Sequence, residues 1–294
     1  MPKMNTLPVQ TNQKKGIFSY RFKLGVGKGI TYLLLIGLAM LMLLPFVWMV
    51  SASLKMDKDV FTFPIQWIPE VPQWSNFAKI WTTIPFLTMF ANTSKLTFII
   101  TLLQIFTSSF AGYAFAKLKF KGRDILFLAY ISSIAIPWQA YMVPQFIMMR
   151  RFDLVDSHMA LIMLQAFSAF GVFLMRQFFI SIPNEILDAA RIDGLSEYGI
   201  YFRIMLPLSK PALATLTIFT AVFVWNDFMG PLIYLNSTNL KTIQLGLRMF
   251  IQQYSANYAL IMAASLVSLI PVIVLFLTFQ RFFVEGIATT GIKG

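Results

Sequence analysis

The stretch Gly29–Val50, GITYLLLIGLAMLMLLPFVWMV, decides the fold class of this chain. Its 22 residues carry no charged side chain, and about 20 apolar residues suffice for a helix to cross the hydrocarbon core of a bilayer. The apolar part of a cleavable signal peptide is shorter, at about 7–15 residues. We therefore predict that the stretch is a retained membrane-spanning helix.

The composition of the whole chain is that of a membrane protein. Of 294 residues, 57% are hydrophobic and 12% are charged, whereas about 25% of the residues of an average soluble domain are charged. The apolar runs are continuous rather than alternating, which excludes a transmembrane β-barrel. We predict an all-α, polytopic membrane domain over residues 29–283, flanked by segments 1–28 and 284–294. Its six predicted transmembrane helices are Gly29–Ala52, Asn92–Ala116, Ile125–Met149, Met159–Ile180, Leu208–Leu232 and Tyr258–Phe283.

Lysine and arginine are unevenly divided between the two sides of these helices. Sixteen lie on the side of the two termini, of the loop at 117–123 and of the loop at 181–207, and seven lie on the other side, with the segments at 53–91, 150–151 and 233–257. Because positive charge accumulates on the cytoplasmic side of a membrane protein, we predict that both termini and the 181–207 loop are cytoplasmic. Charges placed beside apolar runs in this way also argue against nucleic-acid binding. The chain has no cysteine, which excludes disulfides and thiol chemistry.

The loop at 181–207, here called the signature loop, contains the charged stretch Asp188–Pro207, DAARIDGLSEYGIYFRIMLP. Asn184 can cap a first short helix, Gly194 can end it in the left-handed conformation, and Ser196 can cap a second helix. We therefore predict a helix, a glycine turn and a helix. A helical wheel places Ile186, Ala189, Ala190 and Asp193 on one side of the first helix. These residues alone are compatible both with a solvated loop and with docking onto another protein.

The spacing within the signature loop matches a known motif. It runs from Asp188-Ala189-Ala190 over three residues to Gly194, then over nine residues to the ending Ile204-x-Leu206-Pro207. This pattern resembles the loop signature of binding-protein-dependent ABC importer permeases, which usually have glutamate where this chain has Asp188. The resemblance implies a cytoplasmic coupling helix that seats in a cleft of a partner ATPase. It assigns to this contact Glu185, Asp188, Ala189, Ala190, Gly194, Ile204, Leu206 and Pro207.

The resemblance extends over nearly the whole chain. The sequences WNDF at 225–228 and EGIATTGIKG at 285–294 are similar to those of the carbohydrate branch, in particular the second permease subunit of maltose-type and oligosaccharide importers. The resemblance implies a type I ABC importer permease of the inner cell membrane that moves a sugar by alternating access. The implied partners are a homologous permease subunit, two copies of a cytoplasmic ABC ATPase, an external sugar-binding protein and membrane lipid. Neither a nucleic acid nor a cofactor is implied.

The chain does not contain the motif of a nucleotide site. A phosphate-binding loop needs glycine, four residues and then Gly-Lys-Ser/Thr. The nearest match, Gly25–Gly29 with the sequence GVGKG, has no serine or threonine after its lysine. We therefore predict a transport subunit rather than an enzyme, with ATP hydrolysis in a partner chain.

Polar residues within the predicted helices are candidates for a solute path, because sugars are bound by hydrogen-bonding side chains and aromatic faces. The candidates for path or gate are Gln104, Gln139, Gln165, Trp225, Asn226 and Asp227. Asp227 is included because an ionisable group inside a predicted span is a functional candidate. Amides also bridge membrane helices and tryptophans also lie at interfaces, so a structural role stays open for each. By the resemblance, the segment at 233–257 docks on the binding protein through Asn239, Gln244, Gln252, Gln253 and Tyr254.

Three other functions are alternatives to a sugar importer. An ABC permease for a non-sugar solute would keep the same motif. An ion-coupled secondary carrier would show inverted repeats and buried ionisable residues, of which Asp227 is the single candidate. A membrane enzyme would need convergent acidic or metal-ligating groups, and the single histidine, His158, makes neither a metal site nor a proton relay.

Overall fold

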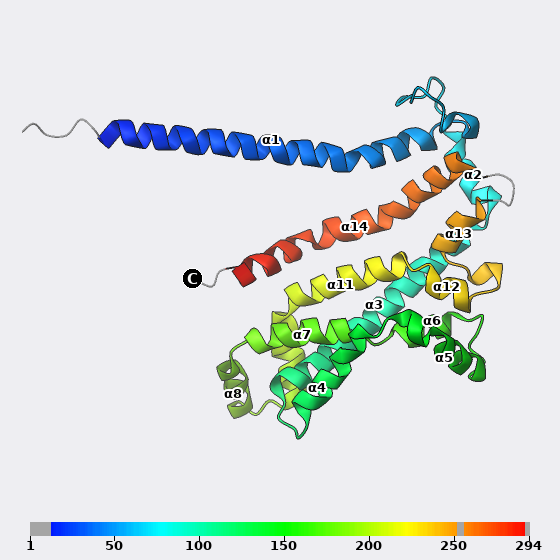
Figure 1. Cartoon of the computed structure of the whole chain (residues 1–294). Coiled ribbons are helices and arrows are strands. Elements are labelled where there is room, and N and C mark those ends of the chain that lie inside the picture. The colour runs from blue at the N-terminus through cyan, green and yellow to red at the C-terminus, as the bar shows by residue number, and fades with distance from the viewer. Residues whose placement is uncertain (1–12, 252–255, 292–294) are drawn as a thin grey trace, which may run out of the picture.

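The computed structural model describes residues 13–251 and 256–291, with side chains over 28–251 and 256–281. Within these residues every named element is a helix, which confirms the predicted all-α class. The long helices run lengthwise through the molecule (Figure 1), and helix α8 (Asn184–Ile192) of the signature loop lies at one end. Helices α2 (Ser75–Thr83) and α13 (Ile243–Met249) lie at the opposite end. These are called here the signature-loop end and the opposite end.

Long unbroken helices form the frame of the molecule. They are α1 (Gln13–Ser53), α3 (Phe86–Lys117) and α14 (Tyr258–Gly291). Lys28–Ser53, Phe86–Lys117 and Tyr258–Arg281 are long and apolar enough to cross a membrane. Helix α1 starts before the predicted span Gly29–Ala52, and α14 continues beyond Phe283 into the segment predicted as a tail.

A fourth candidate span, His158–Ser181, is interrupted near its middle. It consists of α6 (His158–Gln165) and α7 (Ala169–Ser181). The Ser168 hydroxyl accepts a hydrogen bond of 3.0 Å from the Gly171 N–H and so caps the start of α7. The predicted helix Met159–Ile180 is therefore two helices joined by a short break.

The predicted helix Ile125–Met149 is wrong as a continuous helix. In its place the structure has α4 (Arg123–Ser132), the 3-10 turn η2 (Ser133–Ala135) and α5 (Trp138–Arg151). The two helical stretches are bent from one another by 100°. Pro137 explains the break, because proline disfavours helical backbone at the residue before it, and Ile136 is extended.

The predicted helix Leu208–Leu232 is also wrong as a continuous helix. It is divided into α11 (Lys210–Trp225) and α12 (Met229–Tyr234) by a break at residues 226–228. The helical stretch Glu197–Leu208 that precedes α11 is bent from it by 76°. If each bent pair is counted as one span, the described residues contain up to six spans.

The core lies where α3 packs against α7 and α11. Two glycines permit this close packing. A Cβ atom added to Gly112 of α3 would lie 2.7 Å from the Met175 Cβ and 3.0 Å from the Arg176 backbone nitrogen. In the same way, Gly171 of α7 lies directly against the side chain of Ser108 on α3.

Helix α1 contrasts with this core. It lies apart from the other helices over most of its length and approaches α14 toward its C-terminal end (Figure 1). None of the side chains in its most apolar stretch is buried. Packing begins near its C-terminal end, where the buried Ala52 joins a small cluster with Val60 and Ala259.

Candidate functional site

The signature loop has the local structure that its sequence predicts. Helix α8 is followed by Gly194 with a φ angle of +82°, in the left-handed region that favours glycine. The Ser196 hydroxyl then accepts a hydrogen bond from the Gly199 N–H and caps helix α9 (Glu197–Ile200). The predicted cap at Asn184 is wrong, because the cap position is Pro183 and Asn184 is already helical. The Asn184 Oδ1 accepts a hydrogen bond of 2.8 Å from the Lys117 ammonium instead.

Helix α8 packs one face against the protein core. Leu187 is 1% exposed and Ala190 is 4% exposed, and both belong to the core cluster that contains Met175 and Phe179. Leu187 sets this orientation because it is the larger apolar side chain that reaches the core. The side chains left exposed on the helix include four of the predicted coupling and wheel positions, Glu185, Ile186, Asp188 and Ala189.

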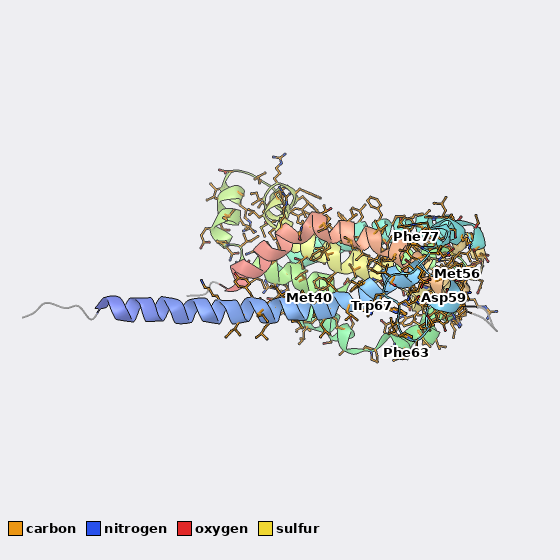
Figure 2. The ribbon with its side chains drawn as sticks, turned by 90° about the horizontal axis from the view of Figure 1, so that it is seen from above. Met40, Met56, Asp59, Phe63, Trp67 and Phe77 are labelled. Atoms are coloured by element: carbon orange, nitrogen blue, oxygen red, sulfur yellow. The ribbon has the colours of Figure 1, made fainter. Side chains whose placement is uncertain are left out.

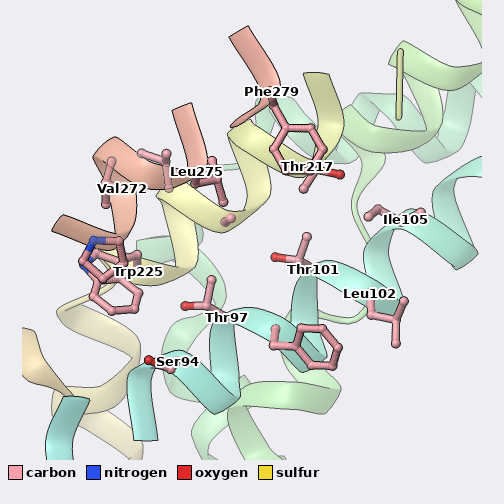
Figure 3. A pocket seen from close by; sticks show the side chains of 14 residues that line it. Ser94, Thr97, Thr101, Leu102, Ile105, Thr217, Trp225, Val272, Leu275 and Phe279 are labelled. Carbon is pink, nitrogen blue, oxygen red and sulfur yellow. The ribbon is translucent and has the colours of Figure 1, made fainter. Parts of the chain in front are cut away.

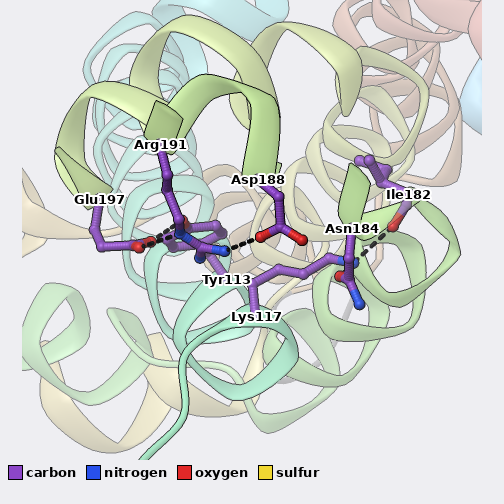
Figure 4. A network of polar contacts seen from close by, with 7 residues as sticks. All are labelled: Tyr113, Lys117, Ile182, Asn184, Asp188, Arg191 and Glu197. Carbon is purple, nitrogen blue, oxygen red and sulfur yellow. Dashed lines mark hydrogen bonds and ion pairs between the residues drawn. The ribbon is translucent and has the colours of Figure 1, made fainter. Parts of the chain in front are cut away.

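A chain of polar contacts ties α8 to α9 and to α3 (Figure 4). The Arg191 guanidinium lies 2.7 Å from the Asp188 Oδ1 and 2.9 Å from the Glu197 Oε1. The other oxygen of Glu197 accepts a hydrogen bond of 2.6 Å from the Tyr113 hydroxyl of α3. Sequence reasoning missed the roles of Tyr113 and Glu197, because no local pattern connects positions 84 residues apart.

Two further contacts join the signature loop to the same helix. The Lys117 ammonium donates to the Ile182 carbonyl at 2.6 Å, and the Ser109 and Tyr201 hydroxyls are 2.7 Å apart. Ser109, Tyr113 and Lys117 are spaced by four residues, so they lie on one face of α3. Helix α3 therefore holds the signature loop at three successive turns.

The second half of the signature loop packs largely against the protein core. After α9 the chain forms the π-helix η3 (Tyr201–Met205) and the short helix α10 (Leu206–Leu208). Ile204 and Leu206 pack against the core cluster, whereas Pro207 is exposed. Three of the eight residues that the resemblance assigns to the ATPase contact therefore face the protein interior, namely Ala190, Ile204 and Leu206.

Three of the predicted path residues form one polar chain across the helix breaks. The Gln104 Nε2 donates to the Gln165 carbonyl at 2.7 Å, and the Gln165 Nε2 donates to the Asp227 Oδ2 at 2.9 Å. Thr220 donates to the Gln104 Oε1 at 2.9 Å, and the Gly230 N–H donates to the Asp227 Oδ1 at 3.0 Å. This chain links α3, the end of α6 and the break between α11 and α12.

The other predicted path residues lie outside this chain. Trp225 is buried, and its indole N–H donates to the Ser268 carbonyl of α14 at 3.0 Å. Asn226 is exposed at the start of the helix break, and Gln139 is exposed in the first turn of α5. The structure thus does not bring Gln139 to the other candidates.

A cavity of about 460 Å³ lies between α3, α11 and α14, with Trp225 in its wall (Figure 3). The wall is mainly apolar, but Ser94, Thr97 and Thr101 of α3 and Thr217 of α11 contribute hydroxyls. The Thr97 and Thr101 hydroxyls are buried and have no hydrogen-bond partner among the described residues. Sequence reasoning did not single out these hydroxyls, although positions 94, 97 and 101 share one helical face.

The predicted docking residues lie partly within the described chain. Asn239 is exposed in the 3-10 turn η4 (Thr238–Leu240), and its carbonyl accepts a hydrogen bond of 2.8 Å from the Asn92 side chain of α3. Gln244 of α13 donates to the Asn226 Oδ1 at 3.3 Å, which joins a docking candidate to a path candidate. The remaining candidates, Gln252, Gln253 and Tyr254, lie outside the described residues.

Asp156 organises the same end of the molecule and was not identified from the sequence. It has a φ angle of +61° in the loop before α6. Its carboxylate accepts hydrogen bonds from the Ser237 hydroxyl and from the backbone N–H groups of Asn236 and Ser237, the latter two at 2.8 Å. The pKa of Asp156 is held below its ordinary value of 3.8, mainly by the two hydrogen bonds from Ser237 and in addition by the one from Asn236.

We expect Asp156→Asn to lower the thermal unfolding midpoint at neutral pH, because asparagine tolerates the left-handed backbone but loses the charge that strengthens these bonds. A depressed pKa stabilises the fold above about pH 4 and ceases to do so as the pH falls through the folded-state pKa. The difference in unfolding midpoint between variant and wild type should therefore become smaller as the pH is lowered from 7 to 3. Asp153→Asn is the matched control, because Asp153 also has a positive φ but no hydrogen bond to its carboxylate in the described chain. A gap of constant size across this range would contradict the assignment.

The chain is similar to characterised proteins over most of its length. A family model described as binding-protein-dependent transport system inner membrane component matches residues 104–288. The arabinooligosaccharides transport system permease protein AraQ of Halalkalibacterium halodurans is 35% identical over 271 residues, which cover 90% of this chain and 97% of that protein. The sn-glycerol-3-phosphate transport system permease protein UgpE of Yersinia pestis is 33% identical over 263 residues, covering 87% and 93%.

A solved structure is similar over almost the whole chain. It is the crystal structure of a bacterial ABC transporter involved in the import of the acidic polysaccharide alginate. One of its chains superposes with a TM-score of 0.78 and 25% sequence identity. The match covers 94% of this chain and 100% of that chain.

Proposed function

Because the chain belongs to the family of binding-protein-dependent transport system inner membrane components, we propose that it moves a sugar or oligosaccharide across the cell membrane as a permease subunit of an ABC importer. Relatives named for arabinooligosaccharides and the similarity to an alginate importer support a carbohydrate as solute. The similarity to an sn-glycerol-3-phosphate permease supports a phosphorylated polyol as the second candidate. The partners in this proposal are a homologous permease, two ABC ATPase subunits and an external binding protein.

The observation that carries the mechanism is the geometry of the signature loop. The exposed side of α8 offers Glu185, Asp188 and Ala189 to a partner, while its buried side is fixed in the core by Leu187. Polar contacts at three turns of α3 hold the loop as one body. Such a body is suited to seat in a cytoplasmic ATPase and to pass the motion of ATP-driven closure to the membrane helices. This contact with a cytoplasmic ATPase requires the signature loop and both termini to be cytoplasmic.

The solute path in this proposal runs past the cavity between α3, α11 and α14. Its hydroxyls from Ser94, Thr97 and Thr101 and the aromatic ring of Trp225 suit a carbohydrate. Gln104 and Gln165 serve mainly to bridge helices, because the Gln104 amide and the Gln165 Nε2 are engaged in the polar chain with Asp227. Asn226 and Asp227 lie near the opposite end, where Gln244 links Asn226 to the segment that docks the binding protein in this proposal.

Reconstitution in proteoliposomes tests this proposal. The chain is purified with its partner permease, ATPase and binding protein, and ATP hydrolysis and solute uptake are measured together. Arabino-oligosaccharides, alginate oligosaccharides and sn-glycerol-3-phosphate are supplied in turn. We expect a sugar-loaded binding protein to stimulate ATP hydrolysis and uptake in parallel. Uptake that is driven by a proton or sodium gradient in vesicles without the ATPase would contradict the proposal.

A further inference from the structure

The segment at residues 56–72, here called the apolar loop, leaves the helical bundle at the opposite end and returns to it. Its ends are tied together by backbone and side-chain hydrogen bonds. The Gln73 N–H donates to the Leu54 carbonyl at 2.8 Å, and the buried Asn76 side chain donates to the carbonyls of Ser53 and Lys55 at 2.9 Å each. The excursion is therefore held at its base, independently of what its tip contacts.

The apolar loop folds back along the end of α1. The Phe61 ring lies 5.8 Å from the Trp48 ring and 4.8 Å from the Tyr258 ring, and the Ser51 hydroxyl donates to the Gln66 carbonyl at 3.4 Å. Figure 2 shows Trp67 beside α1, farther toward the N-terminal end of this helix than Met56 and Asp59. Because Lys28–Ser53 is a candidate membrane span, the returning part of the loop lies at the depth of the last turns of that span.

The composition of the loop suits this depth. Residues 60–69, VFTFPIQWIP, carry no charge and are flanked by Asp59 and Glu70. Phe63 is 91% exposed and Ile68 is 85% exposed. The other exposed apolar side chains of the loop are Met56, Phe61, Ile65, Trp67 and Val71. Exposed apolar side chains gathered in one segment mark an interaction site on a protein.

The backbone of the loop also has fewer polar groups to satisfy than an ordinary loop. Irregular backbone is costly in hydrocarbon because its N–H and carbonyl groups lack partners. Pro64, Pro69 and Pro72 have no N–H to leave unpaired. The cost that remains places such a segment at the boundary between headgroups and acyl chains, where tryptophan and other aromatic residues accumulate.

We propose that the apolar loop inserts its tip, around Phe63 and Ile68, into the membrane lipid at the opposite end of the molecule. Helix α1, against which the loop folds back, also has exposed apolar side chains along its central part. The charges of the loop are Asp57, Lys58, Asp59 and Glu70, which leave it net acidic. The contact is therefore with acyl chains and the interface rather than with an anionic headgroup.

The absence of cysteine from the chain allows a direct test. Phe63→Cys and Ile68→Cys are made singly in the full chain, purified with the subunits that accompany it, spin-labelled and placed in nanodiscs. The accessibility of each label to oxygen, which partitions into lipid, is compared with that to a water-soluble nickel chelate. Lys79→Cys on the exposed side of α2 is the matched control. Nanodiscs of phosphatidylcholine are compared with nanodiscs that also contain phosphatidylglycerol.

We expect both loop labels to favour oxygen over the nickel chelate by severalfold more than the label at position 79, and equally in the two lipids. Labels at 63 and 68 that favour the nickel chelate would show the tip in water and overturn the proposal. Labels that neither reagent reaches would show that a protein partner covers the tip, which overturns it equally. The measurement needs no solute or ATP, so its outcome is independent of the transport assay.

Discussion

Replacing Arg191 with glutamate is expected to reduce the binding-protein-stimulated ATPase activity of the reconstituted transporter by about tenfold. The substitution removes the ion pairs with Asp188 and Glu197 and places three acids side by side. Each partner is at least 38% exposed, so solvent screening limits each pair to about 1 kcal/mol or less. Two such losses with added repulsion approach the 1.4 kcal/mol that corresponds to a factor of ten.

Arg203→Glu is the matched control for this prediction. It makes the same change of charge in the same loop, but Arg203 is exposed and has no ion pair in the described chain. Stimulated hydrolysis and solute uptake are measured for both variants beside basal hydrolysis, and the amount of assembled complex is measured by size-exclusion chromatography. Equal losses of stimulated ATPase activity in the two variants would mean that the net charge of the signature loop, rather than the ion pair between Arg191 and Glu197, determines this activity.

Replacing Gly112 with leucine is expected to destabilise the protein by about 3 kcal/mol, the upper part of the range for overpacked cores. Even the first carbon of the new side chain would lie 2.7 Å from the Met175 Cβ and 3.0 Å from the Arg176 backbone nitrogen. Backbone cannot yield as a flexible side chain does, so α3 and α7 would have to separate. The thermal unfolding midpoint in detergent and the yield of monodisperse protein should both fall.

Gly37→Leu provides the comparison for this effect. Gly37 lies in α1, and a Cβ atom added there would meet nothing within 4 Å. The same substitution at this site should leave the unfolding midpoint close to that of the wild type. Similar midpoints for the two leucine variants would contradict the close packing of α3 on α7.

The sequence predicted the helix content and the signature loop because both depend on local patterns. Long apolar runs dictate helices in lipid, and the spacing from Asp188 to Gly194 dictates a helix ended by a left-handed residue. The break at Pro137 was also within reach, since proline restricts the residue before it. The break at Asn226 was not, because its apolar flanks read as one helix and Asp227 is accommodated by Gln165 from another helix.

The candidate sites show the same difference between local patterns, which can be predicted from the sequence, and tertiary contacts, which cannot. The coupling positions follow from spacing within one loop, whereas their fixation by Tyr113 and Lys117 depends on tertiary contacts over 65 to 84 residues. The amide side chains were correctly noticed as polar residues within spans, but their hydrogen bonds to other helices cannot be read from a single sequence. The hydroxyls at 94, 97 and 101 could not be predicted as a site, because nothing in the sequence shows that these serine and threonine residues line a cavity.

Helix α3 is fastened at both ends of the molecule. Asn92 holds the carbonyls of Asn239 and Lys241 at one end, and Lys117 holds the signature loop at the other. At 1.5 Å per residue the two attachments are about 38 Å apart along an unbroken rod. In the proposed function, this helix joins the docking segment near Asn239 to the signature loop that contacts the ATPase. Substitutions near Asn239 that change the solute should then also alter the coupling of ATP use to transport, and such variants should be tested for ATP hydrolysis without uptake.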